Sequence, residues 1–305
     1  MQLILTTNCS GLKTAPADLT LCARNLPKAG AEELAEEWTR RCESATPRFV
    51  ASELYNGRAF KIARETAVRA RVRLLVISAG FGLLQPETAI PSYSLTITPH
   101  PDSILRRAVK GQAFSASEWW KRLKAHHRST LSFRHLLKSN PSSLLIIATT
   151  NPYLRMITHE LAALETDLLE RIRIIGPKSA VDLPEQLSPL LMPYTNQLND
   201  PRLPIHGTEF DFAARAAAHF VDVIGVCCRG DSIEGHKKAV RGALATLVMP
   251  EAPSRANIGD TQLRHLIASF KREKTPQGKA LRRLRDEFRY CCGTEHFDLL
   301  WGTSE

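Results

Sequence analysis

Residues 74–96 read LLVISAGFGLLQPETAIPSYSLT, an apolar run that leads directly into a loop of small residues and one aromatic. Continuous apolar runs are typical of strands buried on both faces of a parallel sheet, and the loops after such strands commonly bind ligands. In this loop Ser78 and Gly80 would let the backbone approach a ligand closely, and Phe81 would offer a flat face for stacking. The alternative for the same residues is a tight turn above a core phenylalanine.

Other apolar runs extend the predicted sheet, and these lie at 2–7, 144–148 and, more weakly, 171–175. The run at 2–7 ends in a turn-forming cluster and is expected to be the central strand. Helical spacing of apolar residues predicts helices at 31–42, 58–71, 208–226, 232–248, 259–272 and 276–290. A long ordered surface loop is expected at 177–204.

The predicted fold class is therefore α/β, a three-layer parallel sheet with a mixed edge and helices on both faces. We expect two parts, an α/β domain that binds the ligand at 1–230 and a basic helical region at 231–305.

Charge is unevenly distributed along the 305 residues. The chain carries a net charge of +10, but segments 58–73, 106–134 and 263–289 carry +5, +7 and +6, so the remainder carries −8. Segregated positive charge favours a polyanionic partner, and double-stranded DNA is the partner we predict. Three solvated helix faces are the alternative.

Cysteine spacing and hydropathy exclude several classes of protein. Seven cysteines without regular spacing favour a reducing compartment, so a cytoplasmic protein is expected. Apolar runs fall short of the roughly 20 residues of a membrane span. Adjacent cysteine pairs do not match zinc-ligand spacing, and a Walker loop is absent, so neither a metal nor a cofactor is predicted.

Four motifs carry a resemblance to a known family. They are NCSGLK at 8–13, ELYNGRAF at 53–60, SAGFGLL at 78–84 and IPSY at 90–93. In this order they resemble the bacterial domains related to the peroxide-stress protein YaaA, over about the first 100 residues. The resemblance implies the uracil-DNA-glycosylase superfold, with its site at the carboxyl ends of the central strands.

Two departures from that family stand out. Gly80 occupies the position where the family usually has lysine, so no role of that lysine transfers to this chain. Between the first two motifs the chain also has some 25–30 extra residues, among them the helix predicted at 31–42.

Base excision requires the nucleotide to be flipped out while water attacks a sugar with oxocarbenium character. By resemblance, Asn8 is the candidate that positions this water, and a turn asparagine is the alternative. Glu53 and Asp211 are the candidate acids that would stabilise positive charge on the sugar or act as general bases. Each has a structural alternative, a helix-start acid for Glu53 and a helix cap for Asp211.

The predicted base pocket combines two aromatic faces with small and polar side chains. Tyr55 and Phe81 would sandwich the flipped base, and Asn56 and Ser78 would bond to its edge, although both aromatics also suit a protein core. The full set of base-binding candidates is Cys9, Ser10, Tyr55, Asn56, Ser78, Gly80 and Phe81.

A further set of polar and basic side chains is predicted to contact the nucleic-acid backbone. These residues are Arg58, Lys61, Asn151, Tyr153, His206, Thr208, Arg282 and Arg283. For the loop at 149–153 a routine strand-to-helix turn is the alternative.

The function predicted from the sequence is a DNA glycosylase that excises a modified base, for example glycosylated hydroxymethylcytosine or a 7-deazaguanine of phage DNA, in anti-phage defence. A monofunctional enzyme is expected, because Lys13 and Lys61 only flank the predicted pocket in sequence. A non-catalytic DNA-binding stress protein and a tRNA-base modification enzyme are the alternatives.

Overall fold

The computed structural model describes residues 2–127, 131–176, 183–228, 230–248 and 254–303. The chain divides into two units, Met1–Met249 and Pro250–Glu305. The boundary predicted at 230/231 is therefore corrected to a later position. The physical reason is that helix α10 (Ile233–Ala245) buries Val240 and Leu244 in the core of the first unit.

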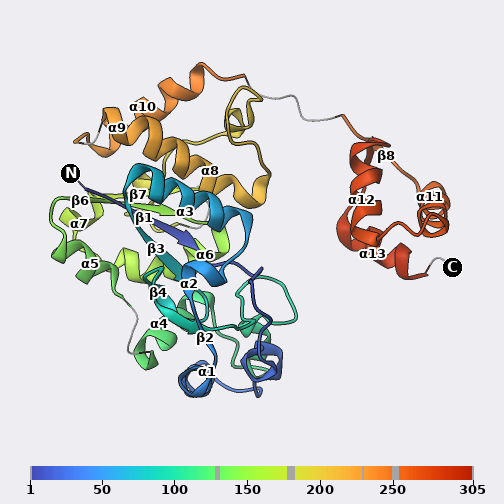
Figure 1. The fold of residues 1–305 in the computed structure, drawn as a ribbon, viewed down its shortest axis with the longest axis horizontal. Coiled ribbons are helices and arrows are strands. Elements are labelled where there is room, and N and C mark those ends of the chain that lie inside the picture. The colour runs from blue at the N-terminus through green and yellow to red at the C-terminus, as the bar shows by residue number, and fades with distance from the viewer. Residues whose placement is uncertain (1, 128–130, 177–182, 229, 249–253, 304–305) are drawn as a thin grey trace. The chain divides into compact units, whose positions relative to one another are not determined.

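A mostly parallel five-stranded sheet lies at the centre of the described part of the first unit (Figure 1). Its order is β4-β3-β1-β6-β7, and β4 runs antiparallel to β3 at one edge. The predicted α/β class, the mixed edge and the central position of β1 are confirmed. The strands are β1 (Gln2–Asn8), β3 (Arg73–Ser78), β4 (Gly82–Leu84), β6 (Ser143–Ala148) and β7 (Ile172–Ile175).

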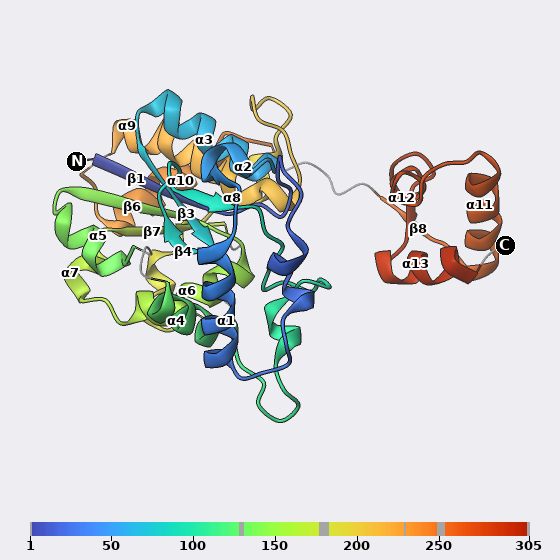
Figure 2. The same cartoon turned by 60° about the horizontal axis from the view of Figure 1, so that its bottom comes forward.

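Side chains of the central strands alternate between two hydrophobic cores, as a sheet covered on both faces requires. In β1, Ile4 faces one core, whereas Leu3 and Leu5 face the other. One face is covered by α3 (Arg58–Ala70), α8 (Phe212–His219) and α10 (Figure 2). The opposite face is covered by α1 (Ala31–Ser44), α4 (Ala116–His126), α5 (Phe133–Ser139) and α6 (Asn151–Ala162).

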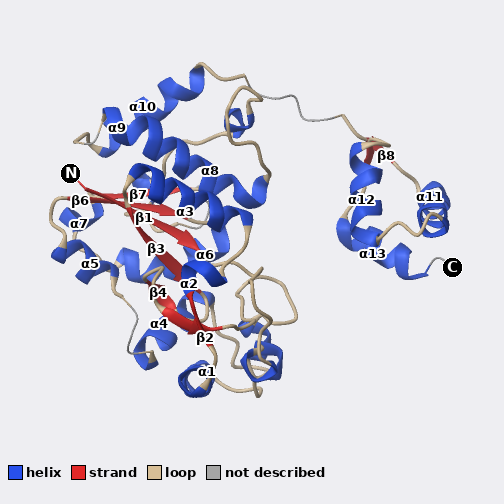
Figure 3. Cartoon of the chain, in the orientation of Figure 1, coloured by secondary structure: helices blue, strands red, loops and turns tan. Residues whose placement is uncertain are grey.

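Shorter elements complete the first unit (Figure 3). They are β2 (Arg48–Val50), α2 (Ala51–Leu54), β5 (Ala89–Pro91), α7 (Thr166–Leu169) and α9 (Gly225–Cys227). Of the loop predicted at 177–204, residues 177–182 lie outside the described residues, and 3-10 turns at Ser188–Leu190 and Asn196–Asn199 interrupt the remainder.

The second unit has its own apolar core, which includes Leu263, Phe270, Leu284 and Phe297. Its elements are β8 (Ala256–Asn257), α11 (Asp260–Arg272), α12 (Gln277–Asp286), β9 (Tyr290–Cys291) and α13 (Thr294–Thr303). The helix predicted at 276–290 therefore ends earlier, because the chain turns at Arg289 (φ 57°) into β9. Throughout the described residues, every helix is too short or too polar to cross a membrane.

The corrected boundary makes a prediction about truncated chains. A chain ending at residue 248 keeps α10 and should unfold as the first unit does in the full protein. A chain ending at residue 230 exposes the site where Val240 and Leu244 are buried, and each lost side chain costs about 1.5–3 kcal/mol. Urea denaturation of both fragments measures the difference. Equal stability of the two fragments would show that α10 does not belong to this core.

A buried pair, Arg173 and His236, predicts a pH dependence of stability. Arg173 Nε donates to His236 Nδ1 at 2.8 Å, and His236 Nε2 lies 2.7 Å from the Cys228 carbonyl, to which it donates, so the ring is neutral. Burial, reinforced by Arg173, lowers the pKa of His236. As the pH falls, His236 therefore takes up a proton more readily in the unfolded chain than in the folded chain. The free energy of unfolding should decrease as the pH drops below about 6.5, the usual pKa of histidine.

We expect His236→Gln to flatten this dependence between pH 8 and pH 5.5, as measured by urea denaturation. The matched control, His135→Gln on the exposed side of α5, should keep the slope of the unmodified protein. If the free energy of unfolding of His236→Gln kept the same slope against pH as the unmodified protein, His236 would not be the source of the pH dependence.

Candidate functional site

A pocket of about 360 Å³ opens beyond the carboxyl ends of β1 and β6. Its volume lies within the range of about 300–1,000 Å³ usual for small-molecule sites. Predicted site residues Asn8, Cys9 and Tyr153 line it together. The other lining residues are Gly11, Lys13, Ser94, Leu95, Thr96, Thr98, His100 and Thr150.

Asn8, the last residue of β1, is held in one orientation by the end of β6. Thr149 Oγ1 donates to Asn8 Oδ1 at 2.7 Å, and Asn8 Nδ2 donates to Thr150 Oγ1 at 3.2 Å. Both threonines follow β6, which pairs with β1 in parallel register, so the sheet itself brings these groups together. Within the described part of the chain, these two bonds leave one amide hydrogen and one oxygen lone pair of Asn8 for further hydrogen bonds.

Cys9 and Tyr153 form a second polar contact in the pocket, with 3.4 Å between Cys9 Sγ and Tyr153 Oη. Burial raises the pKa of Tyr153 well above its ordinary value, so its hydroxyl stays protonated. Tyr153 was predicted to contact the nucleic-acid backbone, and the structure places it in the pocket on α6. Asn151 is exposed at the start of that helix, next to Pro152, as the strand-to-helix alternative describes.

Tyr55 and Ser78 belong to a buried hydroxyl cluster that Tyr93 completes. Ser78 Oγ lies 2.8 Å from Tyr93 Oη and 3.4 Å from Tyr55 Oη, and the two tyrosine hydroxyls are 3.0 Å apart. Tyr55 and Tyr93 are each about 1% exposed. Tyr55 therefore cannot stack on a base without leaving the core, and its predicted stacking role is corrected.

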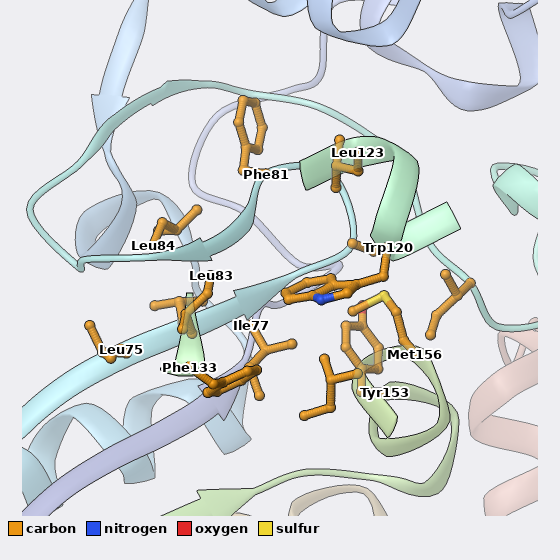
Figure 4. Packing of buried hydrophobic residues seen from close by; sticks show 14 of the residues in the cluster. Leu75, Ile77, Phe81, Leu83, Leu84, Trp120, Leu123, Phe133, Tyr153 and Met156 are labelled. Atoms are coloured by element: carbon orange, nitrogen blue, oxygen red, sulfur yellow. The ribbon is translucent and has the colours of Figure 1, made fainter. Parts of the chain in front are cut away.

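Phe81 is likewise a core residue and not an open stacking face. It is 2% exposed and packs edge-on against Tyr93 and His127, with ring centroids 5.0 and 5.3 Å apart. Figure 4 shows it among buried side chains that include Leu84 and Leu123. The alternative of a turn above a core phenylalanine is the one that the structure supports.

Gly80 is required by close packing. A Cβ at this position would lie 2.7 Å from Tyr93 Cε2 and 3.2 Å from Trp38. The Gly80 carbonyl also accepts a hydrogen bond from Trp38 Nε1 at 2.7 Å. Trp38 lies on α1, so this helix and the loop at Gly80 belong to one packing arrangement.

The first two motifs lie against each other. Asn56 N–H donates to the Leu12 carbonyl, and Thr14 N–H donates to the Leu54 carbonyl, each at 2.9 Å. A Cβ on Gly57 would lie 2.2 Å from Ser10 Oγ. Ser10 and Asn56 are thus placed beside the pocket by backbone pairing, but neither is among its lining residues.

Lys13 lies inside the pocket, so the sequence-based expectation that lysine only flanks it is wrong. Its Nζ lies 4.1 Å from the ring centroid of Tyr93 and 5.9 Å from that of Tyr55. Burial lowers the pKa of Lys13, although Cys9, Cys22 and Asp102 act to raise it.

Asp102 lies behind the pocket lining, where it accepts a hydrogen bond from the lining residue Ser94, and the sequence analysis does not predict this role. Arg24 donates to it through its backbone N–H at 3.0 Å and through Nε at 2.8 Å, and Ser94 Oγ donates at 2.8 Å. Burial acts to raise the pKa of Asp102, but the hydrogen bonds from Arg24 and Ser94 prevail and hold it below its ordinary value. A lone aspartate between Pro101 and Ser103 carries no sequence signal for this role.

Neither predicted catalytic acid lies with Asn8. Glu53 is exposed on α2, and its backbone carbonyl accepts from Thr14 Oγ1 at 3.1 Å. Asp211 is a helix cap, since Thr208 N–H donates to Asp211 Oδ1 at 2.8 Å. Asp211 also pairs with buried Arg215 at 2.9 Å. The catalytic role predicted for Asp211 is therefore corrected to the capping alternative.

Of the phosphate contacts predicted in the first unit, the side chain of Arg58 is engaged within the protein. Arg58 Nε lies 3.1 Å from Asp211, and its Nη2 donates to the His206 carbonyl. The His206 side chain and Lys61 are exposed. Thr208 serves as the N-cap of the turn that leads into α8.

In the second unit, Arg283 is half-buried over the Phe270 ring and pairs with Glu273 at 2.6 Å and Glu287 at 3.0 Å. Its neighbour Arg282 is exposed. Of the two predicted phosphate-binding arginines on α12, Arg282 is therefore the one that remains accessible.

A scan against protein-family models matches no family, and a search of curated proteins also returns no match. The function proposed below is therefore inferred from the geometry of the site and from the motif resemblance.

The packing at Gly80 gives a stability prediction. In Gly80→Ala the new methyl group meets the buried Tyr93 ring, and overpacking of this kind costs about 1–3 kcal/mol. The matched control is Gly242→Ala in α10, where a Cβ meets nothing within 4 Å and helix propensity favours alanine by roughly 0.5–1 kcal/mol. Urea denaturation should show opposite signs for the two variants. A neutral or stabilising Gly80→Ala would contradict the packing account.

Proposed function

We propose that the first unit is a DNA glycosylase of the uracil-DNA-glycosylase-like and YaaA-related group, which flips out a modified base and hydrolyses its N-glycosidic bond. The observation that carries the proposal is the fixed amide of Asn8 in a pocket at the carboxyl edge of a parallel sheet. Open α/β sheets bind ligands at this edge.

The amide of Asn8 is suited to positioning water, not to deprotonating it. Thr149 and Thr150 fix the rotation of the amide, so its remaining hydrogen and lone pair keep constant directions. A water held there would be directed at the sugar carbon as the bond to the base breaks. Because the water is already oriented, less entropy is lost on reaching the transition state, and the activation free energy is lower. Neither Glu53 nor Asp211 lines the pocket. The proposed excision therefore depends on the orientation of the water more than on a general base.

The size and connections of the pocket favour a bulky base. A second, more open pocket of about 720 Å³ shares Gly11, Lys13 and Ser94 with the first. A base in the first pocket could therefore extend a substituent into the second. Hypermodified phage bases, such as glycosylated hydroxymethylcytosine or a 7-deazaguanine, are the proposed substrates, and defence against phage is the proposed role.

Double-stranded DNA is the proposed partner, supported by the net charge of +10 and by exposed cations such as Lys61 and Arg282. Such contacts set affinity without reading sequence, so binding should weaken steeply as salt increases.

One observation favours a second candidate, a DNA-binding protein without catalysis. The described lining of the Asn8 pocket contains no carboxylate. In that case the basic surface would bind DNA while the pocket excised nothing.

Release of bases from several modified phage DNAs tests the proposal. Mass spectrometry should detect one free modified base together with abasic sites in the DNA. Asn8→Ala should lower the release rate about 100-fold or more, the usual cost of losing one preorganised polar group, while DNA binding is retained. Asn257→Ala, an exposed asparagine of the second unit, is the matched control and should leave release unchanged. If the unmodified protein releases no base from any of these DNAs, the enzymatic proposal is wrong.

A further inference from the structure

Lys13 occupies an unusual place for a lysine, since it lines both pockets beside Asn8 and the Tyr93 ring. The backbone on either side is fixed, because Leu12 accepts a hydrogen bond from Asn56 N–H and Thr14 donates one to Leu54. The start of the side chain is therefore held, and Lys13 lines the same pocket as Asn8.

The amine is not neutralised by a carboxylate. Across the residues that the structure describes, Lys13 forms no ion pair, and the nearby carboxylate of Asp102 is taken up by Arg24 and Ser94. Its close contact is the face of Tyr93, 4.1 Å from Nζ to the ring centroid. An exposed lysine such as Lys61 suits a phosphate contact, whereas the half-buried Lys13 lines the pocket and is placed to meet a ligand there.

The protonation state of the amine is consistent with reactivity. Burial lowers the pKa of Lys13 against the opposing influence of Cys9, Cys22 and Asp102. A larger fraction of the amine is then neutral near pH 7, and the neutral amine is the nucleophilic form.

We propose that Lys13 is a nucleophile that forms a Schiff base with the aldehyde of the abasic sugar left by excision, and that it thereby gives the enzyme a lyase step. This inference rests on the proposed function, because excision supplies the abasic sugar. It replaces the monofunctional enzyme expected from the sequence.

The chemistry balances without an added reactant. The neutral Lys13 amine adds to C1′ of the ring-opened sugar, and loss of one water with uptake of one proton from solvent gives the protonated imine. The imine acidifies the hydrogens on C2′. One of them passes to solvent as a proton, the electron pair forms a C2′–C3′ double bond, and the bond between C3′ and its phosphate oxygen breaks, so the downstream DNA fragment leaves with a 5′-phosphate that carries the electron pair. Water then hydrolyses the imine, which restores the lysine amine and releases an unsaturated aldehyde.

Borohydride trapping tests the inference on the full-length protein with a duplex that carries a preformed abasic site. Reduction of the imine should give a covalent protein–DNA complex, and peptide mapping of the unmodified protein should place the adduct on Lys13. Lys13→Arg keeps the positive charge but cannot form this imine, so the complex should be lost, as it should in Lys13→Gln. The matched control, Lys238→Arg on the exposed side of α10, should trap normally.

A duplex with a tetrahydrofuran analogue, which has no aldehyde, should bind but not trap. Absence of a trapped complex with the unmodified protein, or an adduct that maps to another amine, would overturn the inference. Because the abasic site is supplied ready-made, this result is separate from base excision. Release of a base without trapping would reject the lyase step alone, and trapping without release from any modified DNA would reject the proposed glycosylase alone.

Discussion

The hydroxyl of Ser78 is the interaction on which the site depends. It lies at the end of β3, accepts the N–H groups of Gly80 at 3.2 Å and Phe81 at 3.1 Å, and bonds with the hydroxyls of Tyr55 and Tyr93. A buried polar cluster is stable only when its members satisfy one another, and this one ties the loop after β3 to the second motif. The Tyr93 ring, held by the cluster, then forms the surface over which Lys13 lies.

Part of the positive charge of this protein is paired with acidic side chains of the same chain. Arg58 and Arg69 of α3 pair with Asp211 and Asp222, and Arg134 pairs with Glu165. The basic segments seen in the sequence are therefore not uninterrupted phosphate-binding surfaces. The net charge still favours a polyanionic partner, and in the proposed complex with DNA the phosphate contacts would come from cations that are exposed and, among the residues that the structure describes, unpaired, such as Arg282.

The sequence predicts the central sheet well because strands buried on both faces leave continuous apolar runs, as at 74–77 and 144–148. It predicts the position of Asn8 for the same reason, since carboxyl ends of parallel strands share one edge. It predicts a mixed edge but not the position of β4, a three-residue return strand, and it does not predict the contacts of Lys13 and Asp102. These two residues act through partners such as Tyr93 and Arg24, which are distant in sequence and visible only after folding. Tyr55 and Phe81 fail as stacking residues because aromatic character alone does not distinguish a core from a pocket.

The central claim is that the pocket lined by Asn8, Lys13 and Tyr153 receives the nucleotide that is flipped out of the duplex. Hydrogen–deuterium exchange, with and without a duplex carrying a tetrahydrofuran abasic analogue, measures this most directly. The account predicts that binding protects backbone amides in three segments that surround the pocket, at 8–14, 94–104 and 149–153. Protection confined to residues 254–303, with no change around Asn8, would contradict it and would indicate a DNA-binding protein whose pocket takes no part in recognition.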